Sequence, residues 1–166
     1  HVVLAAGSVP RTIPGFDRGG PILTSDEVLD LDRVPPRVAV IGGGAIGCEF
    51  ASTFADLGAQ VTILEGLPKI LPGLDADVAN VVVRSFKKKK IDIRTGVSVT
   101  GHTPNASGGT TVHFGPSGGA AEALEVDACI VSVGRRPFSD QLGLVGTAVS
   151  VDERGFVAVD EYCRTG

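Results

Sequence analysis

The 166-residue sequence predicts an α/β fold of three layers, with a parallel central sheet and an antiparallel β-meander as one of its crossovers. Three observations support this prediction. Apolar runs of strand length, such as Arg37–Ile41, alternate with stretches whose hydrophobic residues recur at helical intervals. Glycines separate this run from the helix that follows it. Short strand-like stretches between residues 91 and 126 are separated by turns rich in glycine, proline and serine, which is typical of a meander.

The first 36 residues are predicted to form a strand and a linker. Residues 2–8 are a short apolar run that indicates a strand leaving a sheet, and residues 11–20 are rich in proline and glycine. The stretch from Thr24 to Glu27 is typical of a cap before a short helix, which two consecutive prolines then end. The central unit is therefore expected to cover residues 37–138.

The main motif lies where the strand at residues 37–41 meets the next helix. Gly42, Gly44 and Gly47 follow at G-x-G-x-x-G spacing. In such a motif the first glycine permits a sharp turn, the second lets the backbone approach a pyrophosphate, and the third lets the helix lie close to the strand. The helix N-terminus then presents unpaired amides and the positive end of its dipole to an anion.

An acidic residue makes this glycine spacing more specific. The helix is expected to end at residues 57–58, and a second apolar strand over residues 61–64 leads to Glu65, roughly twenty residues after the glycines. A carboxylate there can accept hydrogen bonds from ribose hydroxyls and would repel the 2′-phosphate of NADP. The sequence therefore predicts NAD binding. The alternative is a chance glycine turn, and Lys69 is the only nearby cation that would favour NADP.

The second half of the chain is expected to complete the sheet. Residues 75–90 predict a second crossover helix because apolar side chains recur at i, i+3, i+4 and i+8, and the lysines at 87–90 are interpreted as a solvated face at its end. The apolar run at residues 128–134 suits a buried parallel strand. Gly134 at its end is interpreted either as a ligand-binding position or as an ordinary exit turn. Further short strands are expected at residues 91–93, 97–99, 110–114 and 124–126.

Charge and composition argue against several other functions. A formal net charge of −4 offers no basic surface for nucleic acid or an anionic membrane, and no apolar run reaches membrane-spanning length. Cys48, Cys129 and Cys163 are odd in number and widely spaced, which favours a cytoplasmic location and unpaired thiols that are at least partly buried. His102 and His113 are interpreted as surface or strand residues, so no metal site is predicted.

These motifs resemble a known family, the flavin-dependent pyridine nucleotide-disulfide oxidoreductases, and within it most closely the dihydrolipoamide dehydrogenases. Residues 42–51 are similar to the family's G-G-G-x-I-G-x-E-F-A motif. Residues 5–8 resemble the stretch that leaves its FAD domain, and residues 134–138 resemble its G-R-R-P segment. The resemblance implies a Rossmann-like FAD/NAD(P)-binding domain. Residues 1–36 would leave the FAD domain, residues 37–138 would bind NAD, and residues 139–166 would return toward the FAD domain.

The resemblance also implies roles for single residues. The backbone from Gly44 to Ile46 would hold the pyrophosphate, Glu65 would bind the adenosine ribose, and Glu49 would lie near the nicotinamide. Val99 and Gly134 match family positions that also line the NAD site. The complete set of expected cofactor-binding residues is Gly42, Gly43, Gly44, Ala45, Ile46, Gly47, Cys48, Glu49, Glu65, Val99 and Gly134.

By the same resemblance, the family's redox disulfide, its FAD-binding glycine motif and its acid/base pair are expected outside residues 1–166, so no catalytic residue is assigned within them. The whole enzyme would be a homodimer with its own FAD and interface domains. It would oxidise dihydrolipoamide through its disulfide and FAD and reduce NAD⁺. Two alternatives remain: the NAD domain of another FAD-linked NADH oxidoreductase, such as an NADH oxidase or ferredoxin reductase, and a non-catalytic NAD-binding module.

Overall fold

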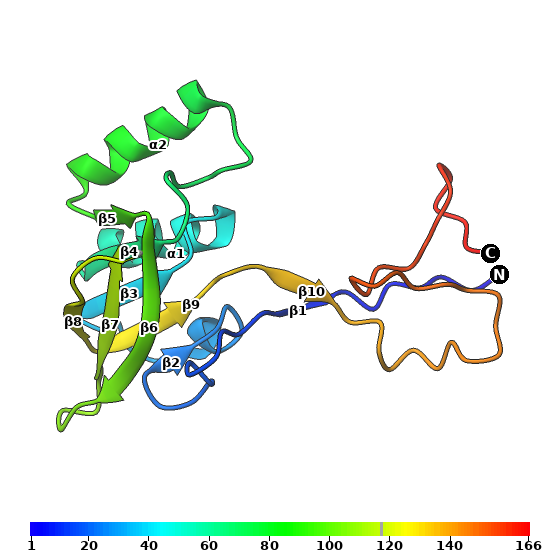
Figure 1. The fold of residues 1–166 in the computed structure, drawn as a ribbon, viewed down its shortest axis with the longest axis horizontal. Coiled ribbons are helices and arrows are strands. Elements are labelled where there is room, and N and C mark those ends of the chain that lie inside the picture. The colour runs from blue at the N-terminus through cyan, green and yellow to red at the C-terminus, as the bar shows by residue number, and fades with distance from the viewer. Residues whose placement is uncertain (117) are drawn as a thin grey trace. The chain divides into compact units, whose positions relative to one another are not determined.

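A computed structural model describes residues 1–116 and 118–166 and divides them into two compact units. The larger unit is Thr12–Gly134, and the smaller one combines His1–Arg11 with Arg135–Gly166. Figure 1 shows that the helices belong to the larger unit and that the smaller one consists mainly of extended chain.

Within the described residues, the larger unit contains a five-stranded parallel sheet in the order β2-β9-β3-β4-β5. The central strand β3 pairs in parallel with β4 and β9, so that Ile41 lies opposite both Leu64 and Val131. Its last four residues are buried, as expected for a strand covered on both faces. The strands are β2 (Ile22–Leu23), β3 (Arg37–Ile41), β4 (Gln60–Glu65), β5 (Asp92–Thr95) and β9 (Ala128–Val131).

The helices occur where the periodicity predicts them. Helix α1 (Ala45–Asp56) connects β3 to β4, and α2 (Ala76–Lys88) connects β4 to β5. Gly58 follows α1 with a φ of +94°, a conformation that favours glycine. The side chain of Asp75 caps α2 by accepting a hydrogen bond from the N–H of Asp77. The predicted helix after Thr24 is a single 3₁₀ turn, η1 (Glu27–Asp30).

The predicted meander is confirmed as an antiparallel sheet in the order β6-β7-β8. Its strands are β6 (Val97–Pro104), β7 (Thr110–Pro116) and β8 (Glu122–Val126). The strand predicted at residues 91–93 corresponds to β5, which belongs to the parallel sheet instead. The meander therefore connects β5 to β9, and the α/β class with a meander crossover is confirmed.

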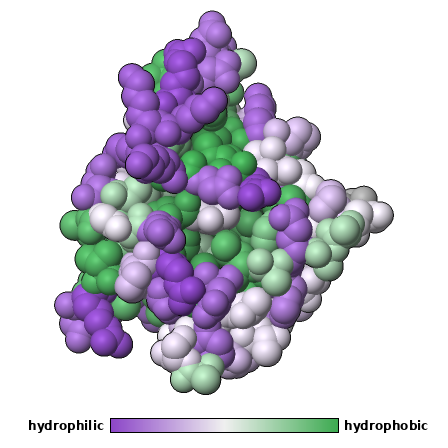
Figure 2. Space-filling model, turned by 90° about the vertical axis from the view of Figure 1, so that its left-hand side faces the viewer, coloured by the Kyte–Doolittle hydropathy of each residue, from purple (hydrophilic) through white to green (hydrophobic). Residues whose placement is uncertain are grey.

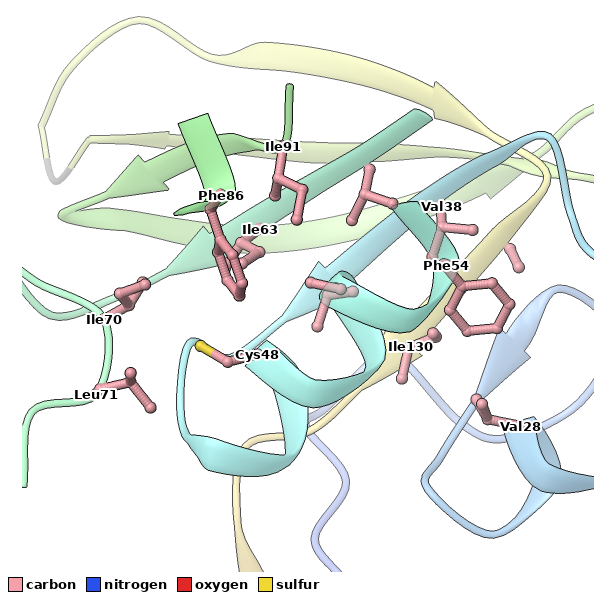
Figure 3. Packing of buried hydrophobic residues seen from close by; sticks show 14 of the residues in the cluster. Val28, Val38, Cys48, Phe54, Ile63, Ile70, Leu71, Phe86, Ile91 and Ile130 are labelled. Carbon is pink, nitrogen blue, oxygen red and sulfur yellow. The ribbon is translucent and has the colours of Figure 1, made fainter. Parts of the chain in front are cut away.

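The parallel sheet separates two hydrophobic cores. Along β3, the side chains of Val38 and Val40 join the helix-side core, whereas Ala39 and Ile41 join the core on the meander side. This alternation follows from the two-residue period of a strand. Figure 3 draws the helix-side core, in which Cys48 and Phe54 of α1 face residues from the sheet and from α2. The result is the three-layer order of helices, parallel sheet and meander.

Apolar side chains also remain on the surface. Val78 and Val81 of α2 are 53% and 57% exposed, and Figure 2 shows uncovered hydrophobic residues among hydrophilic ones on the face that it draws. Single exposed apolar residues are ordinary in globular proteins, since more than half of a folded surface comes from apolar atoms.

In the smaller unit, β1 (Ser8–Pro10) pairs antiparallel with β10 (Arg135–Pro137). The strand predicted over residues 2–8 is wrong for residues 2–7. Val2 and Val3 are 88% and 86% exposed, and no strand among residues 1–116 and 118–166 pairs with them. An apolar run becomes a strand only where a neighbouring strand satisfies its backbone groups, and the described residues supply such a neighbour only from Ser8 onward.

Candidate dinucleotide-binding site

The candidate site lies at the carboxyl edge of the parallel sheet. Beyond the end of β3, the Gly42 N–H donates to the carbonyl of Leu64 (2.9 Å), and the Ser132 N–H donates to the carbonyl of Ile41 (2.8 Å). The chain therefore leaves β3 held between the ends of β4 and β9. In α/β sheets this edge, beyond the carboxyl ends of the strands, is where ligands bind.

Residues 42–47, from the end of β3 through the first residues of α1, form the glycine loop. Two of its glycines are required by the packing of the chain itself. Gly42 has a φ of +106°, and a Cβ there would lie 2.4 Å from the carbonyl oxygen of Ser132. A Cβ on Gly47 would lie 2.0 Å from the carbonyl oxygen of Gly42. These glycines allow the turn and the close approach of α1 to β3 whether or not a ligand is present.

Gly43 and Gly44 differ in the room that an added Cβ would have. A Cβ on Gly43 would lie 2.6 Å from Cγ2 of Ile70, so this glycine too is enclosed by protein. Apart from Gly44 and its neighbours along the chain, no atom of residues 1–116 or 118–166 lies within 4 Å of a Cβ built on Gly44. Its φ of −74° and ψ of −176° are open to any residue. The packing of the described residues therefore does not require a glycine at position 44. Its missing side chain leaves room for a ligand to approach the backbone.

Helix α1 begins at this space. Gly44 is its N-cap, and no side chain of the described residues caps the terminus. The Cys48 N–H donates to the Gly44 carbonyl (2.9 Å) and is the first to enter the helical pattern. The amides of Ala45, Ile46 and Gly47 precede it and remain available to an anion, which the helix dipole also favours.

Glu65 ends β4 beside this loop. The residue is 9% exposed, and its carboxylate accepts hydrogen bonds from the Gly43 N–H (2.5 Å) and the Leu67 N–H (2.7 Å). Each carboxylate oxygen has two lone pairs, so each can still accept a ribose hydroxyl. The spacing of the motif predicts the position of this acid. The spacing does not reveal that the side chain also accepts a hydrogen bond from the backbone of the glycine loop.

Cys48 and Glu49 of α1 point into different surroundings. Cys48 is buried, and its Sγ donates to the Gly43 carbonyl (3.5 Å). Burial raises the pKa of this thiol to about 11, and the carboxylates of Glu65 and Glu49 add to the shift. Cys48 is therefore a neutral thiol that packs behind the loop, while the side chain of Glu49 is exposed.

The other expected residues lie on neighbouring segments. Val99 of β6 is partly buried and packs against the meander-side core. Gly134 is exposed and has a φ of +112°. It follows Ser132 and Val133, whose backbone atoms lie beside Gly42. The structure thus brings the glycines, Cys48 and Glu65 into direct contact, while Val99 contributes to the layer beneath.

Three residues that contact the loop were not predicted from the sequence. Ser132 donates through its hydroxyl to the Gly42 carbonyl (3.4 Å). Ile70 covers Gly43, and the Leu71 N–H donates to the Gly43 carbonyl (2.7 Å). Ser132 could have been found from its place at the end of the strand next to β3. For Ile70 and Leu71, the signal was an apolar pair inside a loop bounded by prolines.

The remaining cysteines and histidines lie apart from the loop. Cys129 is buried, but Cys163 is exposed in a turn, so the prediction that all three thiols are at least partly buried is wrong for Cys163. His102 and His113 lie on β6 and β7, and their rings contact threonine hydroxyls at 2.9 Å, which confirms their interpretation as strand residues.

Two further kinds of feature are absent from the described ranges, 1–116 and 118–166. They contain no group of three or more histidine, cysteine, aspartate or glutamate residues that could hold a metal ion. Neither of their helices is long and apolar enough to cross a membrane.

The parallel sheet, the meander crossover and the glycine loop at the start of α1 define a Rossmann-like α/β domain. The whole chain, residues 1–166, matches the pyridine nucleotide-disulphide oxidoreductase family. The chain belongs to this family, as its motifs indicate.

Individual relatives agree with this assignment. The chain is 39% identical over 166 residues to dihydrolipoyl dehydrogenase from Haloferax volcanii, a match that covers 99% of this chain and 35% of that protein. It is 40% identical over 169 residues to dihydrolipoyl dehydrogenase from Trypanosoma brucei brucei, with the same coverage. The HOCl-induced flavoprotein disulfide reductase from Escherichia coli has a TM-score of 0.86 and 30% identity, covering 97% of this chain and 36% of that one. The chain therefore spans about a third of the length of the relatives it matches.

Proposed function

We propose that this chain is the NAD-binding domain of a flavin-dependent dithiol/disulfide oxidoreductase of the dihydrolipoyl dehydrogenase type. The observation that carries the proposal is the open space beside Gly44, at the uncapped N-terminus of α1 and next to the carboxylate of Glu65. Backbone amides suited to a pyrophosphate and a carboxylate suited to a ribose thus lie at one sheet edge.

Each residue would have a defined part in holding the cofactor. The amides from Gly44 to Ile46 would bind the pyrophosphate, and Glu65 would accept from the adenosine ribose. Glu49, on the exposed side of α1, would lie toward the nicotinamide, and Val99 and Gly134 would line the site. Gly42, Gly43, Gly47 and Cys48 would keep the loop in shape from within the protein.

In the whole enzyme this domain would position NAD against the flavin. FAD and NAD supply the redox chemistry when bound, and the residues of this chain bind and orient the nicotinamide nucleotide. A dithiol, dihydrolipoamide in the relatives' reaction, would give up two electrons and two protons. NAD⁺ would take up a hydride, and one proton would be released.

The proposal extends to the organisation of the parent protein. Residues 1–36 would leave an FAD domain, residues 37–138 would form the NAD-binding domain, and residues 139–166 would return toward the FAD domain. The match to about a third of each relative supports the assignment to one part of a longer protein, whereas the larger unit of the structure begins already at Thr12 and ends at Gly134. We further propose a cytoplasmic homodimer with its own interface domain.

The test is the binding of NADH and NADPH to the 166-residue chain by titration calorimetry at one ionic strength. We expect NADH to bind at least about tenfold more tightly, a difference of about 1.4 kcal/mol, because the carboxylate of Glu65 would repel a 2′-phosphate. Equal affinities, or tighter binding of NADPH, would contradict the assignment of NAD as the cofactor.

A further inference from the structure

The segment between β4 and α2, residues 66–75, folds back onto the glycine loop. Most of it is exposed, but Ile70 and Leu71 are only 1% and 7% exposed and belong to the helix-side core. Figure 3 draws both side chains beside Cys48 in the first turn of α1. Ile70 and Leu71 are therefore an apolar pair in an otherwise exposed segment, and they are buried against the first turn of α1, which adjoins the candidate site.

The contacts of this segment converge on Gly43. The Gly43 N–H donates to Glu65, and its carbonyl accepts from the Leu71 N–H at 2.7 Å and from Sγ of Cys48 at 3.5 Å. The side chain of Ile70 covers the face of Gly43 where a Cβ would otherwise stand. Gly43 is thus fixed by hydrogen bonds at both of its peptide groups and by packing from one side.

The backbone of Leu71 is itself unusual. Its φ of +52° lies in the left-handed region, which residues other than glycine rarely adopt. The burial of its side chain and the hydrogen bond from its N–H to Gly43 hold it there. Strained backbone of this kind persists where the surrounding structure enforces it, and it is common at functional sites.

We infer that Ile70 and Leu71 are positioning residues for the glycine loop: they hold the peptide groups of Gly43 so that the next amides face the pyrophosphate before it binds. The inference rests on the proposed function and adds two residues that are not among those proposed to bind the cofactor. A loop already ordered in the free protein loses less entropy on binding, so its pre-organisation appears as affinity.

The chain offers a matched control for testing Ile70. Ile91 belongs to the same core and is 5% exposed, yet it lies near Phe86 in Figure 3, with its N–H donating to the Phe86 carbonyl. Ile70→Ala and Ile91→Ala remove the same atoms from one core. Ile70→Val removes a single methyl group and retains Cγ2 above Gly43, so it serves as the conservative variant and as a fallback should Ile70→Ala fail to fold.

Two measurements on the 166-residue chain and these variants test the inference. The first is NADH affinity by calorimetry at a temperature where all variants are folded. We expect Ile70→Ala to bind at least about tenfold more weakly than Ile91→Ala, while Ile70→Val stays within about twofold of wild type. The second is amide hydrogen exchange followed by NMR without nucleotide. We expect the Gly43 N–H to exchange at least about tenfold faster in Ile70→Ala than in Ile91→Ala.

The outcomes separate this inference from the proposed function. Equal NADH affinity and equal Gly43 exchange in the two alanine variants would overturn the inference. If the wild-type chain fails to bind NADH, the proposed function is wrong. In that case the exchange rate of Gly43 alone decides whether Ile70 orders the loop.

Discussion

At the scale of single residues, glycine occupies positions 42, 43, 44 and 47 for different physical reasons. An added Cβ would lie within 2.6 Å of protein atoms at Gly42, Gly43 and Gly47, but would meet open space at Gly44. Three of these glycines are therefore needed for the packing of the chain itself, whereas Gly44 is the one that we propose leaves room for a ligand. Mutations can separate the two roles.

We predict that Gly44→Val abolishes NADH binding and leaves the domain folded. The added side chain fills the approach of the pyrophosphate, while its backbone conformation is open to any residue, and losing a glycine N-cap costs about 1 kcal/mol or less. NADH titration together with thermal unfolding checks both parts.

Gly47→Ala is the matched control for this prediction. Its Cβ would lie 2.0 Å from the carbonyl of Gly42, so we expect a loss of stability of about 1–3 kcal/mol in addition to weaker binding. Undiminished NADH affinity in a folded Gly44→Val variant would mean that the phosphates bind elsewhere.

Glu65 contributes to the stability of the fold, and this contribution can be measured without any nucleotide. Glu65→Gln keeps the shape of the side chain but replaces one acceptor oxygen by an NH₂ group facing a backbone N–H. We expect a loss of about 1–3 kcal/mol in the free energy of unfolding, because one buried N–H loses its acceptor.

Urea denaturation of the nucleotide-free chain tests the Glu65→Gln prediction. Glu49→Gln is the control, since Glu49 is exposed on α1, and it should change stability by no more than about 0.5 kcal/mol. Equal effects of the two substitutions would argue against a role of Glu65 in fastening the loop.

At the scale of elements, an ion pair joins the beginnings of β3 and β9. The Arg37 guanidinium donates to both carboxylate oxygens of Asp127, at 3.0 and 2.9 Å, and the Arg37 N–H also donates to Asp127 at 3.0 Å. These bonds hold the register of two neighbouring strands whose opposite ends border the candidate site. They also hold the pKa of Asp127 below its ordinary value, chiefly through the hydrogen bond from Arg37.

This ion pair predicts a pH dependence of stability. Because the pKa of Asp127 is lower in the folded chain than in the unfolded chain, its contribution is complete above the unfolded value, about 3.9, and is lost as pH falls through the folded value. Urea unfolding of wild type and Asp127→Asn should therefore differ by a constant amount from pH 5 to 7 and converge below about pH 4. A difference that stays constant down to pH 3 would contradict this account.

At the scale of the whole molecule, the chain carries one glycine-rich nucleotide motif and spans about a third of its relatives. Its cysteines at positions 48, 129 and 163 are free thiols, two of them buried. Burial raises the pKa of Cys129 to about 12, so this thiol does not form the thiolate needed for disulfide exchange.

We predict that the purified 166-residue chain is colourless and lacks dihydrolipoamide:NAD⁺ activity although it binds NADH. The chain has no second glycine motif for FAD and no closely spaced cysteine pair, so electrons have no path from dithiol to nicotinamide. A visible spectrum and an NADH-formation assay test this. A flavin absorbance band, or turnover above background, would contradict the proposed domain boundaries.

The sequence by itself determined the features that depend on near neighbours along the chain. The apolar run of β3, the spacing of Gly42, Gly44 and Gly47, and the periodicity of α1 and α2 each predict an element within a few residues of its observed limits. The meander was predicted in the same way from its short strands and turns. Side-chain period and glycine conformation are local properties, so the sequence displays them directly.

Only the tertiary structure decided which segments meet. It showed that no strand among residues 1–116 and 118–166 pairs with residues 2–7, that Glu65 accepts from the N–H of a residue 22 positions earlier, and that Ile70 and Leu71 pack against or hydrogen-bond to Gly43. Such contacts depend on how parallel strands bring distant loops to one edge, and neither spacing nor composition records this. The motif predicts which residues would contact a cofactor, whereas the packing of the folded chain determines which residues hold the glycine loop in place.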